Sequence, residues 1–281
     1  MAKSKNKPVK YKRYAPPKDK AKVLIFDIET APLLGYVWGL WENNVGLNQI
    51  ESDWHILSWS AKWLDAPENE IMYMDQRAAV KVEDDKGILK EIWELLDQAD
   101  VVITQNGKSF DQKKLQARFL MNGFQPHSSY KHIDTKLIAK KFFALTSNKL
   151  EYMSDQLCTK YKKLKHKEFP GFELWRECLA GNIKAWQEME LYNKHDVLTL
   201  EELYNIMIPW DGNAVNFNLY TNTDANVCKC GSCLFIKNGF YYTNVGKFQK
   251  HKCKGCGAES RDRQNLFSKE KRAALQTNTV R

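Results

Sequence analysis

Two carboxylates lie close together at the end of an apolar run near the start of the chain. In "KVLIFDIETAP" (residues 22–32), Asp27 and Glu29 follow a run of apolar residues. Alternate residues of a strand point to the same face of a sheet, so we expect these two side chains to project together. Two anions so close repel each other unless a cation lies between them. The pair therefore predicts a metal site.

Other acids in the sequence are candidates to complete this metal site. Asp111 ends "QNGKSFD" (105–111), which follows the predicted strand 101–104, and open α/β sheets bind ligands beyond the carboxyl ends of their strands. In "YNKHD", Tyr192 and Asp196 are four residues apart and share one face of a predicted helix. Four acids so placed could hold two divalent cations about 3.5–4 Å apart, an arrangement used for in-line displacement at phosphorus. Mg²⁺ or Mn²⁺ suits such all-oxygen ligation.

Periodic apolar patterns predict the elements that position these residues. Three predicted strands come first and are followed by alternating helices and strands, which predicts an α/β fold with a mixed sheet covered by helices. An Asp at the start of segment 84–99 could cap the helix predicted there. The predicted strands are 23–26, 55–64, 69–76, 101–104 and 132–135, and the predicted helices are 84–99, 111–123, 149–157 and 183–207.

The acidic motifs resemble those of a known family. "FDIET", "NGKSFD" and "YNKHD" are similar to the three exonuclease motifs of the DEDD superfamily, in the variant with tyrosine in the third motif. The resemblance covers about residues 23–208 and includes "HIDT" (132–135) and "NKL" (148–150). It implies a ribonuclease H-like fold, whose element order agrees with the predicted one. It also implies metal-dependent hydrolysis of phosphodiesters that releases nucleotides from a 3′ end.

The resemblance implies roles for individual residues. The first metal, which activates water, would be held by Asp27, Glu29 and Asp196. The second would be held by Asp27 and Asp111, and Tyr192 would orient the attacking water. Simpler interpretations exist, since Asp111 could merely cap its helix and Tyr192 with Asp196 could form a solvated helix face.

Other residues near the motifs are expected to contact substrate, to support the site or to play no part in catalysis. Asn106, in the second motif, and Lys149, in "NKL", are candidate substrate contacts. Asp134 is expected to support the site rather than bind metal, because the four expected acids are already assigned. The family's histidine variant requires a histidine five residues before the last aspartate, where this chain has Leu191. We therefore do not expect His195 to act as a general base.

Five of the seven cysteines fall between residues 228 and 256. "CKCGSC" (228–233) and "CKGC" (253–256) form two knuckles of the kind that bind tetrahedral zinc through thiolates. With no export signal in the sequence, such clustering favours a metal over disulfides. The pattern predicts a small zinc-ribbon domain. The expected ligands of one structural Zn²⁺ are Cys230, Cys233, Cys253 and Cys256.

The sequence leaves the fourth zinc ligand open. Cys233 gives the usual two-residue spacing and is preferred on that ground. Cys228 in its place would put Gly231 directly after the second cysteine of the knuckle, just as Gly257 follows Cys256. Four thiolates would close the coordination shell, so we expect this zinc to be structural and necessary for the ribbon to fold.

The formal charge of +9 is unevenly distributed along the chain. Residues 1–22 contain nine Lys/Arg and one acid, and residues 228–281 contain twelve Lys/Arg and three acids. Two basic arms beside an acidic body predict a polyanionic partner, although lysine-rich termini can also serve only solubility. Basic and aromatic residues of the ribbon suit phosphates and bases, with protein binding as the alternative. They are Lys247, Lys250, Lys252, Lys254, Arg261 and Arg263, interleaved with Tyr241, Tyr242 and Phe248.

An aromatic loop, "LLGYVWGLW" (33–41), follows the first motif. Its rings could stack on the terminal bases of a substrate, because aromatic faces bind single strands with little sequence preference. For any single tryptophan in this loop, we expect burial in the core instead.

These observations predict a 3′–5′ exonuclease that acts on nucleic acid, with DNA favoured over RNA. The alternatives are a structure-selective endonuclease on the same fold and a nucleic-acid-binding protein with an inactive nuclease core. No polymerase domain is recognisable, so proofreading would require a partner, and replication or repair proteins are candidate partners.

We expect a cytoplasmic protein without membrane contact, since the sequence shows no secretory signal and no span of about 20 apolar residues. The expected segments are a basic flexible arm (1–22), the exonuclease domain (23–208), a linker (209–226), the zinc ribbon (227–263) and a basic tail (264–281).

Overall fold

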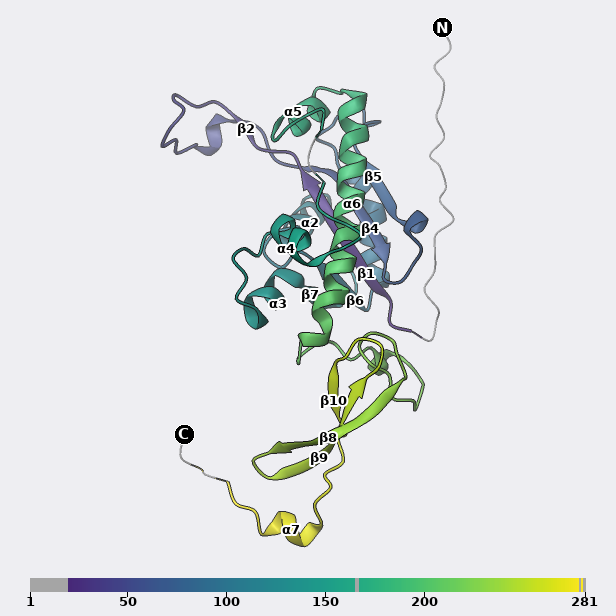
Figure 1. Ribbon diagram of the computed structural model, residues 1–281. Coiled ribbons are helices and arrows are strands. Elements are labelled where there is room, and N and C mark those ends of the chain that lie inside the picture. The colour runs from purple at the N-terminus through teal and green to yellow at the C-terminus, as the bar shows by residue number, and fades with distance from the viewer. Residues whose placement is uncertain (1–19, 165–166, 278, 280–281) are drawn as a thin grey trace. The chain divides into compact units, whose positions relative to one another are not determined.

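A five-stranded mixed sheet forms the core of the first of two units into which the chain divides, Met1–Tyr204 and Asn205–Arg281 (Figure 1). The structure is a computed structural model that describes residues 20–164, 167–277 and 279. The strands of the sheet are β1 (Val23–Thr30), β4 (Ile56–Trp63), β5 (Met72–Asp75), β6 (Val101–Thr104) and β7 (Lys131–Asp134). Their order is β5-β4-β1-β6-β7, and β1 runs antiparallel to β4 but parallel to β6. This confirms the predicted mixed α/β sheet.

Strand β1 lies at the centre of the sheet and is longer than predicted. It continues to Thr30 rather than ending at residue 26, so both acids of the first motif lie within the strand. Leu24, Phe26 and Ile28 pack in the main core cluster. Because side chains alternate along a strand, Asp27 and Glu29 project from the other face of the sheet.

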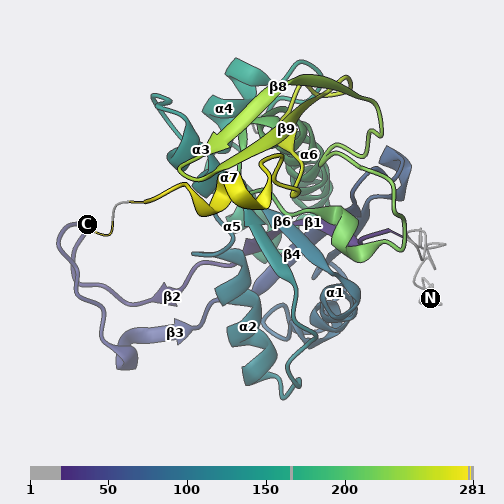
Figure 2. The same cartoon turned by 90° about the horizontal axis from the view of Figure 1, so that it is seen from below.

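Helices cover both faces of the sheet (Figure 2). Seen from below, α1 and α2 lie on one side of β1, β4 and β6, and the long α6 lies on the other. Two short helices, α3 and α5, have no counterpart among the predictions. Among the described residues, no helix combines the length and the apolar character that crossing a bilayer requires. The helices of this unit are α1 (Lys86–Gln98), α2 (Asp111–Met121), α3 (Thr135–Phe142), α4 (Leu150–Leu157), α5 (Glu173–Leu179) and α6 (Ile183–Met207).

An ion pair buried in this unit involves the aspartate that precedes α1. Asp85 occupies the N-cap position, yet its side chain makes no capping hydrogen bond to the helix. Its carboxylate instead accepts hydrogen bonds from Arg118 Nε at 2.7 Å and Nη2 at 2.8 Å, and from the backbone N–H of Ile56 at 2.9 Å. Asp85 is therefore not the expected cap, because it connects α1 to α2 and to strand β4. The neighbouring Asp84 instead accepts a hydrogen bond from the backbone N–H of Lys86, the first residue of α1, at 3.3 Å.

Replacing Asp85 with alanine is expected to lower the free energy of unfolding by about 3–5 kcal/mol, because the Arg118 guanidinium would stay buried without its partner. Urea denaturation followed by circular dichroism measures the loss. The control is Glu68→Ala, which removes the partner of Lys160 in an exposed ion pair and should have a much smaller effect. Equal effects of the two substitutions would contradict this role for Asp85.

A two-stranded ribbon extends from the end of β1, made of β2 (Leu34–Gly35) and β3 (Ile50–Ser52), with a 3₁₀ helix η1 (Leu47–Gln49) before β3 (Figure 1). Trp38 and Trp41 at its tip have exposed fractions of 99% and 86%. The expectation that a tryptophan of this loop is buried is therefore wrong. The chain leaves the sheet as a narrow ribbon, and β2 and β3 pair with each other rather than with the five-stranded sheet.

The second unit contains a three-stranded antiparallel sheet in the order β10-β9-β8. The segment predicted as a linker, 209–226, includes the last two residues of one 3₁₀ helix and the whole of another. The elements after α6 are η3 (Ile208–Trp210), η4 (Phe217–Tyr220), β8 (Phe235–Thr243), β9 (Gly246–Cys253), β10 (Glu259–Arg261) and α7 (Lys269–Ala273).

Candidate functional site

Three of the four predicted acids come together in the first unit. The ligand oxygens of Asp27 and Glu29 on β1 and of Asp196 on α6 lie within 4.8 Å of one another. Asp111 is the first residue of α2, and its carboxylate accepts a hydrogen bond from the backbone N–H of Ile28 at 3.3 Å. It therefore contacts the same strand but lies outside the group of three. We call Asp27, Glu29, Asp111 and Asp196 the acid site.

Burial and neighbouring acids raise the pKa values of three of these carboxyls, those of Asp27, Glu29 and Asp111. Burial, together with the negative charges of the other three, raises the pKa of Asp27 well above its usual range. Burial and Asp196 raise the pKa of Glu29 to about 8, and burial raises that of Asp111 to about 7. A bound cation would relieve this repulsion and favour the charged forms. The residues present therefore fit a divalent cation.

A lysine that the sequence did not single out also lies in the acid site. Lys163, between α4 and α5, places its Nζ 2.9 Å from a carboxylate oxygen of Asp196 and 4.9 Å from the ring centroid of Tyr192. Burial alone would lower the pKa of Lys163, but Asp196 and Tyr192 beside it outweigh burial and raise that pKa. The ammonium group therefore stays charged and balances part of the negative charge.

Three further residues hold the first motif in place. The fully buried Asn193 on α6 donates a hydrogen bond to Asp27 at 2.7 Å, and the hydroxyl of Ser58 on β4 donates to the Asn193 carbonyl at 3.3 Å. Trp175 on α5 donates a hydrogen bond to Glu29, which partly offsets the rise in that residue's pKa. Because β4, α5 and α6 all contact the two acids of β1, tertiary packing fixes their orientation.

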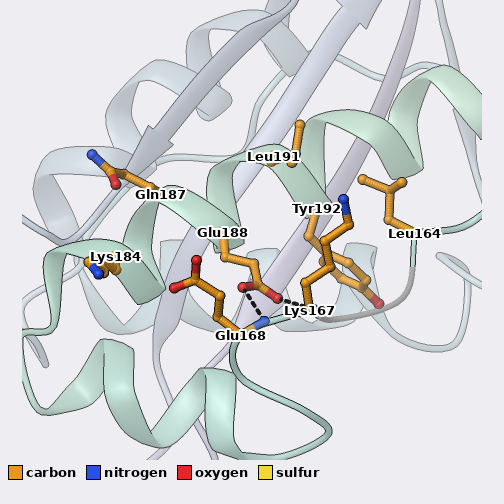
Figure 3. A pocket seen from close by; sticks show the side chains of 8 residues that line it. All are labelled: Leu164, Lys167, Glu168, Lys184, Gln187, Glu188, Leu191 and Tyr192. Carbon is orange, nitrogen blue, oxygen red and sulfur yellow. Dashed lines mark hydrogen bonds between the residues drawn. The ribbon is translucent and has the colours of Figure 1, made fainter.

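Tyr192, one helical turn before Asp196 of the acid site, also lines a cavity (Figure 3). Its ring meets that of Trp175 edge to face, with centroids 6.3 Å apart, and burial followed by Asp196 raises the pKa of its hydroxyl. The hydroxyl therefore keeps its proton at neutral pH and can donate a hydrogen bond. The adjoining cavity has a volume of about 380 Å³ and is lined by Leu164, Lys167, Glu168, Lys184, Gln187, Glu188, Leu191 and Tyr192.

The turn that carries the second motif is held by Asp134 at the end of β7. Its carboxylate accepts hydrogen bonds from the backbone N–H groups of Asn106 at 3.0 Å, Lys108 at 3.2 Å and Lys136 at 3.0 Å. These bonds agree with the expected supporting role. Lys136 Nζ also donates to the Asn106 side chain at 3.0 Å. Lys149 is exposed at the N-cap of α4, and its predicted contact with substrate, like that of Asn106, stays a prediction.

Four cysteines gather in the second unit, with sulfur atoms all within 4.8 Å of one another. The Sγ atoms of Cys228 and Cys256 are 3.5 Å apart, and those of Cys230 and Cys253 are 3.6 Å apart. A disulfide would require about 2.0 Å. Tetrahedral zinc with Zn–S bonds of about 2.3 Å places its sulfurs about 3.8 Å apart. The cluster therefore fits zinc better than it fits disulfides.

The cluster contains Cys228 and not Cys233, so the spacing argument that preferred Cys233 is wrong. Gly231 adopts a left-handed φ of +80° and donates its N–H to the Cys228 carbonyl at 2.8 Å. The carbonyl of Ser232 then accepts the N–H of Cys228 at 2.9 Å. This tight turn folds the chain back, holds Cys228 in the cluster and leaves Cys233 exposed.

The second knuckle repeats this turn. Gly257 has a φ of +78° and donates its N–H to the Cys253 carbonyl at 3.0 Å, and Cys253 donates its N–H to Ala258 at 2.9 Å. Each knuckle thus ends in a cysteine followed by a left-handed glycine, a position that glycine occupies without strain. The alternative based on the two glycines thus predicted which four cysteines gather in the structure.

Comparison with known proteins places the first unit in a family. A model of the RNase H superfamily matches residues 50–208, which include Asp111 and Asp196 but begin after β1. Among solved structures, the family B DNA polymerase from the hyperthermophilic archaeon Pyrobaculum calidifontis is similar, with a TM-score of 0.44 and 15% sequence identity. The similarity covers 70% of this chain and 26% of that one, so the chain spans about a quarter of the polymerase. No curated protein matches the chain.

Proposed function

The chain belongs to the RNase H superfamily, and from this premise we propose that it is a metal-dependent 3′–5′ exonuclease that hydrolyses phosphodiester bonds, with DNA as the favoured substrate. The observation that carries the proposal is the convergence of Asp27, Glu29 and Asp196 within 4.8 Å. These acids come from a strand and a helix far apart in the sequence. A buried cluster of like charges has a folding cost, which the binding of cations would offset.

The acid site supplies the ligands for Mg²⁺ or Mn²⁺. Asp27, Glu29 and Asp196 would hold one ion, and Asp27 with Asp111 would hold the second. Once bound, the ions would activate water and neutralise the charge that develops on the transferring phosphate and the leaving oxygen. In the second unit, Cys228, Cys230, Cys253 and Cys256 would hold one structural Zn²⁺.

The other side chains of the site have roles that need no metal. Tyr192 keeps its proton, so its hydroxyl would orient the attacking water as a hydrogen-bond donor rather than act as a base. Asn193 fixes the direction of the Asp27 carboxylate through its 2.7 Å hydrogen bond. Burial lowers the pKa of His195, yet its ring nitrogen lies 3.2 Å from the hydroxyl of Thr199 on its own helix, which does not favour a role in catalysis.

A nuclease assay tests the direction of hydrolysis. The full chain is incubated with 5′-labelled single-stranded DNA and RNA, with Mg²⁺ or Mn²⁺ and without either. We expect ladders that shorten one nucleotide at a time from the 3′ end, and release of mononucleotides. Circular single-stranded DNA is the control, because it has no 3′ end and should stay intact. Nicking of the circle would support the endonuclease instead, and absence of hydrolysis on every substrate would support a binding protein.

Binding of Mg²⁺ or Mn²⁺ is expected to release protons and to strengthen as pH rises from about 6 to 8. Glu29, with a pKa of about 8, and Asp111, with a pKa of about 7, retain protons that a cation must displace. The folding stability of the metal-free protein depends on pH in the opposite direction. Because the pKa of Glu29 is raised in the folded state, its contribution to stability is complete below about pH 4.5 and is lost as pH rises through 8.

Titration calorimetry in two buffers with different ionisation enthalpies counts the released protons. The observed enthalpy should differ between the buffers at pH 7, and Glu29→Gln should reduce the difference because it removes one titrating carboxyl. Equal enthalpies in both buffers would show that the acids are already ionised and would contradict the prediction.

A further inference from the structure

The hairpin formed by β8 and β9 exposes large aromatic side chains. Phe240, Tyr241 and Tyr242 near the end of β8 have exposed fractions of 45%, 46% and 61%. None of the three belongs to the core cluster around the cysteines. Adjacent exposed rings on a two-stranded ribbon are an apolar surface of the kind that serves binding.

One face of this hairpin places a guanidinium over two rings. Strand pairing puts Tyr241 opposite Phe248, and Lys250 opposite Arg261 of β10. The Arg261 guanidinium lies 4.1 Å from the ring centroid of Phe248 and 5.3 Å from that of Tyr241. A positive charge and aromatic faces are thus presented side by side.

The other face repeats the arrangement with a lysine. Tyr242 is paired with Lys247, and Phe240 is paired with Gln249, two residues further along β9. Lys247 Nζ lies 3.9 Å from the ring centroid of Phe240 and 5.9 Å from that of Tyr242. Since strand residues alternate, Phe240 and Tyr242 share the face opposite to Tyr241.

Acids near the hairpin are few and are paired. Residues 228–281 contain twelve Lys/Arg and three acids. Glu259 forms an ion pair with Lys250 at 3.1 Å, and Asp262 lies 2.9 Å from His251. The surface is therefore strongly positive, which favours a polyanion as its partner.

We propose that hairpin β8–β9, together with Arg261, binds single-stranded nucleic acid. Bases would stack on Tyr241 and Tyr242, and phosphates would contact the lysines and the arginine. This goes beyond the proposed hydrolysis, because the hairpin contains none of the acid site and would bind whether or not the chain cleaves. It gives the second unit a binding activity of its own.

The aromatic rings favour a single strand over the alternatives. In a duplex the bases are already stacked on each other, so exposed rings would gain little, whereas a single strand offers a face of every base. Protein interfaces are depleted in lysine at their centres, yet Lys247 lies between the two rings of its face. Rings with adjacent cations are the combination that binds single strands without sequence preference.

Fluorescence anisotropy of labelled oligo(dT), oligo(U) and a DNA duplex tests the proposal. The full zinc-loaded chain carries Asp27→Ala in every sample, so that the probe is not cleaved. In that background Tyr241→Ala with Tyr242→Ala should weaken single-strand binding by at least about tenfold. Tyr241→Phe with Tyr242→Phe keeps both rings and should bind as before. Lys247→Ala with Lys252→Ala should reduce the slope of log affinity against log salt by about 0.7 for each lysine.

Zinc content measured on each variant shows whether the unit is still folded. Loss of affinity with zinc retained, together with the reduced salt slope, supports the proposal. Unchanged binding by the alanine variant, or duplex bound as tightly as single strand, overturns it. If the alanine variant loses zinc, the salt slope of the lysine variant decides whether the hairpin binds nucleic acid. Lys252 is exposed on the surface, so its replacement should leave the unit folded. Failure of hydrolysis in the nuclease assay leaves this result unaffected.

Discussion

Replacing Asp27 with alanine is expected to reduce hydrolysis by at least about 10³-fold, since this carboxylate would contribute to both metal ions and so to the charge balance of the transition state. Binding of single-stranded DNA should be retained or strengthened, because one anion facing the phosphates is removed. The rate is measured as 3′ shortening of 5′-labelled DNA with enzyme in excess, and binding is measured without added Mg²⁺ or Mn²⁺.

The same substitution should stabilise the metal-free protein. Burial and three neighbouring acids raise the pKa of Asp27, so its charged form is unfavourable in the folded state. Its removal should raise the melting temperature at neutral pH and should weaken the further rise that Mn²⁺ causes. An activity loss with a higher melting temperature would separate a catalytic role from misfolding.

The control is Asp155→Ala, which removes an exposed acid of α4 and should leave rate and melting temperature unchanged. Full activity of the Asp27 variant would refute the proposed mechanism. A lower melting temperature for that variant would mean that the acids are not held in repulsion, and would remove the main physical support for a metal site.

The acids of the site could be predicted from sequence because local periodicity places them. Asp27 and Glu29 share a strand face through their two-residue spacing, and Tyr192 and Asp196 share a helix face through their four-residue spacing. Neither relation depends on distant parts of the chain. The structure adds what periodicity cannot give, namely that β1 and α6 bring the ligand oxygens of three acids within 4.8 Å.

Lys163 could not be predicted in the same way. It lies in "KYKKLKHK" (160–167), a lysine-rich segment with no helical or strand period. Which of these lysines turns toward Asp196 depends on how the chain passes over α6, a tertiary relation. Asn193 was also missed, although it follows Tyr192 directly, because its role becomes visible only once β1 and β4 lie beside α6.

The two missed helices, α3 and α5, contain eight and seven residues. Helices this short are not stable in isolation and form only where packing supports them, so the periodic signal they carry is weak. Helix α5 buries Leu174 and Cys178 in a cluster with Trp186 of α6. That packing places Trp175 beside Glu29, so a missed helix also meant a missed site residue.

Replacing Cys228 with serine is expected to remove zinc from the second unit and unfold it, whereas replacing Cys233 with serine should leave one zinc per chain. Cys228 lies within 4.8 Å of the other three sulfurs, and Cys233 is exposed outside that group. A structural zinc site supplies much of the folding free energy of so small a unit, about 10–16 kcal/mol in zinc-finger peptides. Loss of one of the four thiolates should therefore leave the second unit without zinc and unfolded.

Metal analysis of the purified variants gives the zinc stoichiometry, and amide hydrogen exchange over residues 227–263 shows whether the strands of this unit persist. Exchange within β1 and β6 is the internal control, because the sheet of the first unit contains no cysteine ligand. Zinc lost from the Cys233 variant but retained by the Cys228 variant would restore the ligand set that spacing favoured. Zinc retained by both would mean that either cysteine can complete the site, and the tight turn at Gly231 would then have to open to exchange them.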